Sequence, residues 1–364
     1  MQHRVLWGTL AFVSLFTSQA FTPVPAQAGE LSDSTNYKVL EPIHHNNLTV
    51  FPVVAGKSYD TAGFITLDEG IKRGDVVVTE YGNERGMIRR PGNVQPGYES
   101  ARVNTLVLVN NSKHPLILLA GEIVTGGRQD RVIGKDRIVP AESDPIDLSV
   151  FCVEHGRWVG DSNKFGAMSM NMAAPSVRGK AMGFQNQQMV WDSVSLAKEG
   201  ALNGLPAAAP APPAVAGTTS YAKVMSDPEI KSQVDAVAKP VEENYASTIK
   251  QLRDRHAVGV VVAVNGTFIW ADLFASTDLL ERYWPKLVRS YATEAIVTRA
   301  KGTTPTQAGA QAFLDRLDGR HETIDREPGL YRHTEVSGDG FKAFELTSLL
   351  PKTDYPVHIA KMVE

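Results

Sequence analysis

The sequence predicts an α+β fold, in which a β-rich N-terminal part packs on an α+β C-terminal part with an antiparallel sheet. Short runs rich in Val, Ile, Leu and Thr, separated by Gly, Asn and Pro, follow one another from residue 37 to about residue 154. The second half mixes helical periodicity with strand-like runs, and Asn265-Gly266 between two such runs marks a tight hairpin. We expect the first part to form a sandwich or an irregular barrel.

The first 28 residues have the pattern of a secretory signal peptide. Met1–Arg4 is a short basic start, residues 5–16 are apolar but too few to span a bilayer, and Ala26-Gln-Ala28 is a small-x-small cleavage pattern. Cleavage is expected to leave a mature chain that begins at Gly29, and an uncleaved anchor is the alternative. The predicted location is therefore the periplasm or the exterior of the cell. No later segment has the length of a membrane helix.

Composition narrows the possible partners. The 364-residue chain has a formal net charge of −3 and no long basic run, so no nucleic-acid partner is expected. Its single cysteine, Cys152, cannot form an internal disulfide. We expect Cys152 to be a buried core thiol rather than a nucleophile, because strand alternation puts it on the opposite face from His155.

The β-rich part, residues 29–160, is expected to consist of short strands. These are Leu48–Val54, Phe64–Leu67, Asp75–Glu80, Asn104–Asn110, Pro115–Val124, Arg131–Ile133 and Ile146–Glu154. Residues 161–220 lose this rhythm and are expected to be irregular, with an extended Ala/Pro-rich stretch at 206–215.

The α+β part, residues 221–364, combines helices and strands. The expected helices are Asp227–Arg255 bent or interrupted by Pro240, one that follows the cap Ser276 and kinks or restarts at Pro285, and one from the cap Thr304 to Leu317. The expected strands are Val258–Val264, Thr267–Phe274, Leu330–Val336, Phe341–Leu346 and Val357–Lys361. The two-residue turn at Asn265-Gly266 places Asp272 opposite Gly259.

Two glutamates interrupt apolar strand faces and carry the functional prediction. Glu122 lies in LLAGEIVTGGRQDRVI and Glu154 lies in VFCVEHGRW, and a glycine and an arginine follow each of them. A buried carboxylate without a partner costs several kcal/mol, so each must find a cation or a donor. One interpretation is two structural ion pairs at strand ends. The other is a single pocket in which arginines bind an anionic ligand and the carboxylates bind a sugar hydroxyl, a metal or a proton.

The pocket hypothesis names specific residues. The candidate catalytic residues are Glu122 and Glu154, and the ligand-binding candidates are Arg128, Gln129, Arg131, Arg157, Trp158 and Asp272. Met168, Met170 and Met172 form an alternate-residue set of thioethers, which bind Cu(I) well, although methionines more often fill packing gaps. No metal site is otherwise expected.

Several segments together resemble a known family. They are Asn47–Pro52, Leu67–Glu69, Val78–Glu80, Gly121-Glu122, Gly126–Arg131, Cys152–Trp158, Val190-Trp191, Asp272–Phe274, Trp284–Leu287 and Ser290-Tyr291. The chain resembles the ADP-ribosylglycohydrolase- and rhodanese/phosphatase-associated protein domain family over about residues 37–364. The resemblance implies a link to NAD-derived or ADP-ribosyl nucleotides, and it carries over no catalytic residue.

Three function classes follow. The leading hypothesis is an exported protein that binds or processes a nucleotide-like or other anionic small molecule through a Glu/Arg pocket. The alternatives are a non-catalytic envelope or interaction protein and, as an outsider, a copper-handling protein.

Overall fold

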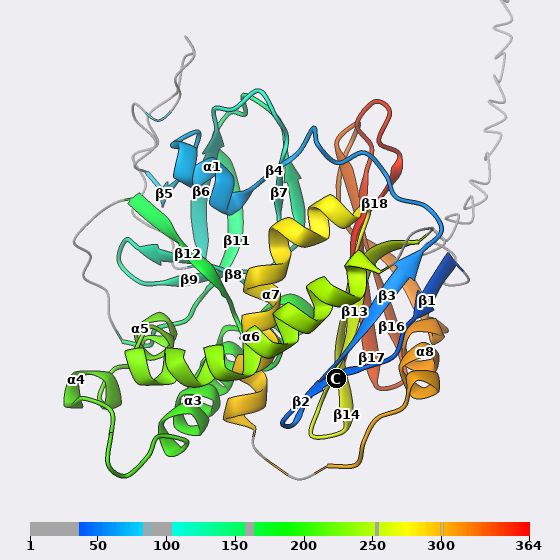
Figure 1. Cartoon of the computed structure of the whole chain (residues 1–364). Helices are drawn as coiled ribbons and strands as arrows, with labels where there is room; N and C mark the ends of the chain where they lie inside the picture. The colour runs from blue at the N-terminus through cyan, green and yellow to red at the C-terminus, as the bar shows by residue number, and fades with distance from the viewer. Residues whose placement is uncertain are drawn as a thin grey trace, which may run out of the picture.

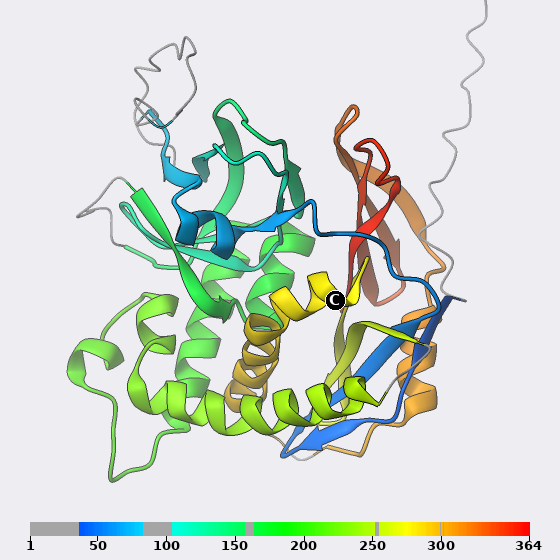
Figure 2. The same cartoon turned by 45° about the horizontal axis from the view of Figure 1, so that its top comes forward.

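The computed structural model describes residues 36–82, 87, 104–156, 164–251, 255–298, 300 and 302–364, without the side chains of residues 169 and 170. The predicted signal peptide lies outside these ranges. The predicted α+β class is confirmed: a closed barrel lies beside a large antiparallel sheet, with helices between and around them (Figures 1 and 2). No helix among the described residues is long and apolar enough to cross a membrane.

The β-rich part contains the barrel. Its strands, in the order in which they pair, are β11 (Ile146–Cys152), β6 (Thr105–Asn110), β5 (Val76–Glu80), β12 (Lys164–Met172), β8 (Glu122–Gly126) and β9 (Arg131–Ile133). Alternate residues of these strands, such as Val78, Leu108 and Val150, fill the interior with apolar side chains. A small sheet of β4 (Ile65–Thr66), β7 (Leu116–Leu118) and β10 (Arg137–Val139) shares this core.

The large sheet draws strands from both ends of the chain. In order it contains β1 (Tyr37–Val39), β3 (Leu48–Ala55), β13 (His256–Val264), β14 (Thr267–Phe274), β18 (Tyr355–Val363), β17 (Phe341–Ser348), β16 (Tyr331–Gly338) and β15 (Arg320–Glu327), while β2 (Ile43–His45) pairs with β3. Residues 37–55, which we assigned to the β-rich part, therefore belong to the sheet of the C-terminal part. A cut of the chain at residue 160 would divide this sheet.

Helices join the barrel to the sheet. They are α1 (Leu67–Arg73), α2 (Pro175–Gly179), the π-helix η2 (Lys180–Phe184), α3 (Gln187–Asn203), α4 (Pro213–Ala216), α5 (Tyr221–Met225), α6 (Pro228–Lys250), α7 (Thr277–Val297) and α8 (Gln307–Asp315). Helix α7 lies between the barrel and the large sheet in both views and contacts β12 on one side and β13 on the other. One continuous apolar core includes Phe151 of the barrel, Leu287 of α7 and Val262 of the sheet.

The expected strand Pro115–Val124 is two strands. The first strand ends before Gly121, whose φ of +94° favours glycine. A Cβ at this position would lie 2.6 Å from Cγ of Arg178. Glycine is therefore required here both by the positive φ and by the close approach of Arg178, a side chain distant in sequence, and Glu122 begins a new strand rather than interrupting an old one.

Three further expectations are corrected. Of the segment 161–220, the described residues 164–220 are not irregular throughout, since they contain β12, α2, η2, α3, α4 and the cap of α5. A bulge between Val262 and Ala263 shifts the hairpin by one residue, so Asp272 faces Val260 instead of Gly259. The last helix is capped by Thr306, whose hydroxyl accepts a hydrogen bond from the backbone of Gly309, and not by Thr304.

The residues predicted to form one strand at Phe64–Leu67 divide between a strand and a helix. Thr66 caps α1 and forms a capping box with Glu69, a Thr-x-x-Glu pattern that is readable in the sequence. Helices α6 and α7 run through Pro240 and Pro285 without interruption. The cap at Ser276 and the turn at Asn265-Gly266, both with the predicted roles, are confirmed.

Candidate functional site

Strand ends bring one group of charged residues to one end of the barrel. We call this group the barrel mouth: Glu80, Arg128, Gln129, Asp130, Arg131, Cys152 and Glu154. The inward alternation of Val76 and Val78 continues to Glu80, and Arg131 faces Cys152 across the β9–β11 pair. All of these residues except Arg128 are buried.

The hairpin between β8 and β9 forms one side of the barrel mouth. Gly127 has φ of +53°, and a Cβ there would lie 2.1 Å from the ring of Phe165 and 2.7 Å from Glu80 Oε1. The glycine therefore lets the tip pack directly on Phe165 and Glu80. The backbone N–H of Arg128 donates to Glu80 Oε1 at 2.8 Å, and the Arg128 side chain is exposed at the tip.

Two carboxylates of the barrel mouth, those of Asp130 and Glu80, differ in the hydrogen bonds that their oxygens accept. Asp130 accepts from the backbone of Gly126 at 3.1 Å and from the hydroxyl of Ser220 at 2.9 Å, so it ties the hairpin to α5. Glu80 is 1% exposed, and its Oε2 has no hydrogen-bond partner among the described residues. A buried carboxylate oxygen without a donor is unusual in a folded protein and requires an explanation.

The interior of the barrel mouth is buried and polar. Arg131 is fully buried and donates from Nη1 to the carbonyl of Gln129 at 2.7 Å. Burial raises the pKa of the Cys152 thiol, although the positive charge of Arg131 partly offsets this. Cys152 is therefore a core thiol in this structure, as predicted, rather than a thiolate nucleophile.

Glu122 lies elsewhere. Val124 and Cys152 both pair with Arg131, and Glu122 precedes Val124 by two residues while Glu154 follows Cys152 by two. Four strand positions separate them along the barrel, which corresponds to roughly 13 Å. The single pocket that we expected around both glutamates is therefore not formed: Arg128, Gln129, Arg131 and Glu154 share the barrel mouth, and Glu122 does not.

Glu122 belongs to an ion-pair group between α1 and α7, the α1–α7 cluster of Asp68, Glu69, Glu122, Arg282 and Lys286. The ammonium of Lys286 lies 2.5 Å from Glu122 and 2.6 Å from Asp68. Burial raises the pKa of Glu122 even with Lys286 beside it. Burial alone would lower the pKa of Lys286, but the two carboxylates outweigh it and raise that pKa.

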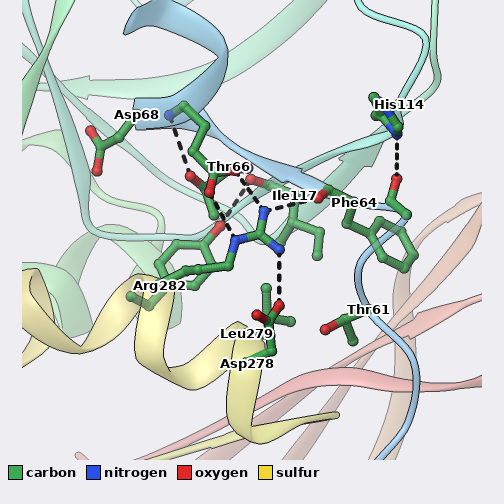
Figure 3. Close-up of polar contacts among 12 residues, drawn as sticks. Thr61, Phe64, Thr66, Asp68, His114, Ile117, Asp278, Leu279 and Arg282 are labelled. Atoms are coloured by element: carbon green, nitrogen blue, oxygen red, sulfur yellow. Dashed lines mark hydrogen bonds and ion pairs between the residues drawn. The ribbon is translucent and has the colours of Figure 1, made fainter.

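Arg282 completes this cluster one turn of α7 away (Figure 3). Its guanidinium contacts Glu69 at 2.6 Å and 2.9 Å, donates to the carbonyl of Phe64, and lies 3.5 Å from Asp278. Every charged group of the α1–α7 cluster thus has a protein partner, and the cluster attaches α1 and β8 of the barrel to α7.

Asp272 belongs to a third group, which we call the buried bridge: Asp136, Arg178, Asp272, Tyr291 and His358. Arg178 binds Asp272 through two parallel contacts of 2.8 Å and 2.9 Å, and the hydroxyl of Tyr291 donates to the same carboxylate. His358 lies between Asp272 at 3.0 Å and Asp136 at 2.6 Å. Arg178, Asp272 and His358 are fully buried.

The charges of the buried bridge balance one another. Burial opposes ionisation of Asp272, but Arg178 and His358 outweigh it and hold the pKa of this carboxyl well below its usual range. Burial would likewise lower the pKa of His358, but Asp136 and Asp272 raise it. A histidine that donates from both ring nitrogens is protonated, so two cations face two carboxylates. The bridge joins the barrel side of the molecule to β14, β18 and α7.

The remaining predicted residues are placed as follows. Arg157 and Trp158 lie outside the described residues. Met168 and Met172 are buried in the main apolar core, and the side chain of Met170 is not described. No group of three or more His, Cys, Asp or Glu side chains is arranged to hold a metal ion within the described ranges.

A family comparison bears on these observations. The model of the ARG and Rhodanese-Phosphatase-superfamily-associated Protein domain matches residues 36–361. The chain belongs to this family. No curated protein and no solved structure matches the chain. The family domain therefore includes the barrel, the large sheet and all three charged groups.

Several residues of these groups were not predicted. Glu80 ends the inward row Val76-Val78-Glu80, the same pattern that drew attention to Glu154, so the sequence contained a signal for it. Arg178 lies in the segment expected to be irregular, and His358 lies in a strand that also contains the buried Lys361, with no pattern that singled out either residue. Lys286 is separated from Glu122 by 164 positions, and no local pattern connects the two.

Proposed function

We propose that the barrel mouth binds a small molecule that carries both hydroxyl groups and an anionic group, of which a ribose phosphate is the simplest example. The observation that carries the proposal is Glu80, which anchors the Arg128 backbone through Oε1 and has a buried Oε2 without a donor. A sugar hydroxyl would supply that donor. The exposed guanidinium of Arg128 would bind a phosphate through its planar fork.

The other two charged groups contain no buried carboxylate oxygen without a hydrogen-bond donor among the described residues. The buried bridge is sealed from solvent and fully paired, and every charge of the α1–α7 cluster has a protein partner. Only the barrel mouth combines an exposed arginine with an unsatisfied carboxylate oxygen among the described residues. The family description, which names an association with ARG proteins, supports a ligand related to ADP-ribose.

The proposal includes processing of the bound molecule. Of the two candidate catalytic carboxylates, Glu154 lies at the barrel mouth, whereas Glu122 is held by Lys286. Glu154 is 6% exposed and joins β11 to α5 through a β-bridge with Ser220. We assign it the role of the general base.

Removal of the Arg128 side chain is expected to weaken binding of ribose 5-phosphate on the order of 10- to 100-fold, because a charge-assisted hydrogen bond is lost. Glu80→Gln should also weaken binding, by about tenfold, while its amide oxygen can still accept the Arg128 N–H. Isothermal titration calorimetry measures both effects. The matched control is Arg320→Ala, which removes an arginine that is 78% exposed on β15.

The proposal fails if wild-type protein shows no heat of binding with ribose 5-phosphate, AMP or ADP-ribose. It also fails if Arg128→Ala binds them as tightly as Arg320→Ala does. Thermal unfolding of each variant shows whether a loss of binding comes from a loss of fold.

We also propose that the protein is exported to the periplasm or the exterior of the cell. The basic start, the apolar run and Ala26-Gln-Ala28 support this. Intact-mass measurement of protein recovered outside the cytoplasm should give a chain that begins at Gly29, and Ala28→Asp should block that cleavage. Recovery of a chain with Met1 from the membrane fraction would instead indicate an uncleaved anchor.

A further inference from the structure

A separate cavity lies between α2, η2, β14, α7 and β18, and none of its lining residues belongs to the barrel mouth. Its volume is about 220 Å³, which is below the range of about 300–1,000 Å³ that drug-sized ligands occupy. Pro175, Ile269, Met362 and Val363 make much of its wall apolar. An apolar cavity with a few polar groups is typical of small-molecule sites, and the size of this one suits a molecule of only a few non-hydrogen atoms.

One wall of this cavity comes from the turn at which α2 continues into the π-helix η2. Helices of the π type are rare and occur frequently at functional sites. A Cβ at Gly179, the last residue of α2, would lie 3.1 Å from Cε of Met362 and 3.7 Å from Cζ3 of Trp270. The glycine therefore leaves space between this turn and the two strands β14 and β18. Trp270 contributes only its ring, since its indole Nε1 is buried and not available to a ligand.

Glu294 of α7 supplies the negative charge of the wall. It is 6% exposed, and its Oε2 accepts a hydrogen bond from the backbone N–H of Ser176 at 2.9 Å. No lysine or arginine among the described residues forms an ion pair with it, whereas the buried Glu122 is paired with Lys286. Burial raises the pKa of Glu294, and Ser176 offsets this only in part. Because a carboxylate can accept about four hydrogen bonds, Glu294 has the capacity for a positively charged donor from a ligand.

Lys180, the first residue of η2, supplies the positive charge of the wall. Its side chain is half-buried, and its ammonium lies 4.0 Å from the centroid of the Phe184 ring. Lys180 forms no ion pair with a described carboxylate, Glu294 included, although both residues line the cavity. An ammonium that packs on an aromatic face still has N–H donors for an anion.

We propose that this cavity binds a free α-amino acid with a small apolar side chain. The two opposite charges of the wall are not paired with each other, so a ligand that carries both charges can satisfy both. The ammonium of a free amino acid would donate to Glu294, and its carboxylate would accept from Lys180. Its apolar side chain would lie against Ile269 and Met362. The proposal is independent of the function assigned to the barrel mouth.

L-Valine is the probe for this proposal, measured by calorimetry on the full mature chain. It is expected to bind with a Kd on the order of 0.1–1 mM, given the small number of atoms that it can place in contact. Glu294→Gln, which still accepts the Ser176 N–H through its carbonyl oxygen, should weaken binding about tenfold or more. Lys180→Met should weaken it about tenfold, because the carboxylate loses a charged donor. The matched controls Glu199→Gln and Lys250→Met, at exposed positions of α3 and α6, should leave the Kd unchanged.

Two analogues of valine test its charges separately. Isobutylamine, which lacks the carboxylate, and 3-methylbutanoate, which lacks the ammonium, should each bind at least about tenfold more weakly than L-valine. Binding of either analogue as tight as that of L-valine would overturn the assignment of an amino acid.

Absence of L-valine binding to the wild type, or equal binding by wild type and either cavity variant, would overturn the site. Thermal unfolding shows whether each variant keeps its fold. If Glu294→Gln does not fold, Lys180→Met and the two analogues decide the result. Arg128→Ala should bind L-valine like wild type, which separates this result from that at the barrel mouth.

Discussion

Replacement of Asp272 by alanine is expected to lower the free energy of unfolding by about 3–5 kcal/mol, because removal of one partner leaves a buried charge uncompensated. The Asp272 carboxylate accepts hydrogen bonds from Arg178, Tyr291 and His358. Arg178 and His358 are fully buried, as Asp272 is. After the change, the guanidinium of Arg178 would keep one of its three hydrogen bonds, the one to the carbonyl of Ala120 at 2.7 Å. The loss should be measured by chemical denaturation followed by circular dichroism.

The pH of this measurement follows from the direction of the pKa shifts. Asp136 and Asp272 have lowered pKa values, so their contribution to stability is present above their ordinary pKa of about 3.9 and is lost as the pH falls through the folded value. His358 has a raised pKa, so its contribution is complete below about 6.5 and is lost as the pH rises through the folded value. The difference in free energy of unfolding between wild type and Asp272→Ala is therefore expected to be largest between about pH 4 and 6.5.

The matched control for Asp272 is another aspartate that is paired with an arginine. Asp339 lies 3.4 Å from Arg316, and its side chain is fully exposed. Asp339→Ala should leave stability nearly unchanged, since solvent screens the pair. If Asp272→Ala costs no more than Asp339→Ala, the buried bridge does not hold the two parts of the fold together.

Lys286→Met is expected to cost a similar amount, about 3–5 kcal/mol at neutral pH. The methionine has nearly the shape of lysine but leaves Glu122, which is 2% exposed, without its cation. Glu122 already has a raised pKa and would respond by binding a proton, so the cost should shrink as the pH falls. Lys239→Met, which removes a lysine that is 61% exposed in a pair on α6, is the control and should have little effect.

The double variant Glu122→Leu/Lys286→Met gives the sharper result. Removal of both charges eliminates the uncompensated carboxylate, so the double variant should recover much of the stability that Lys286→Met loses. Equal or greater destabilisation of the double variant would show that the effect comes from packing in the α1–α7 cluster rather than from the charge of Glu122.

Local signals predicted much of the fold. The hairpin at Asn265-Gly266 follows from a turn in which both residues have positive φ, and the cap at Ser276 follows from one hydroxyl and one backbone N–H. The predictions failed where the structure is determined by contacts between residues that are distant in sequence. At Gly121, Arg178 packs where a Cβ would lie, and the closure of the barrel depends on pairing between strands that are far apart in the chain.

The partners of the charged residues were also difficult to predict, because they are distant in sequence. An apolar row that ends in a carboxylate indicates that a partner must exist, and Glu122 does have one. The nearest arginines in sequence were not that partner: strand register places Arg131 opposite Val124, two positions from Glu122 toward the barrel mouth, and the fold brings Lys286 from α7 to Glu122. Alternation predicts which way a side chain points, but only the tertiary arrangement decides which end of a barrel it occupies.

A crystal structure of the mature chain grown with saturating ribose 5-phosphate would test the ligand site at the barrel mouth most directly. The sugar phosphate should lie there, with a hydroxyl within hydrogen-bond distance of Glu80 Oε2 and the phosphate facing Arg128. A structure in which a protein donor satisfies Glu80 Oε2 and the ligand is absent or bound elsewhere would contradict the assignment.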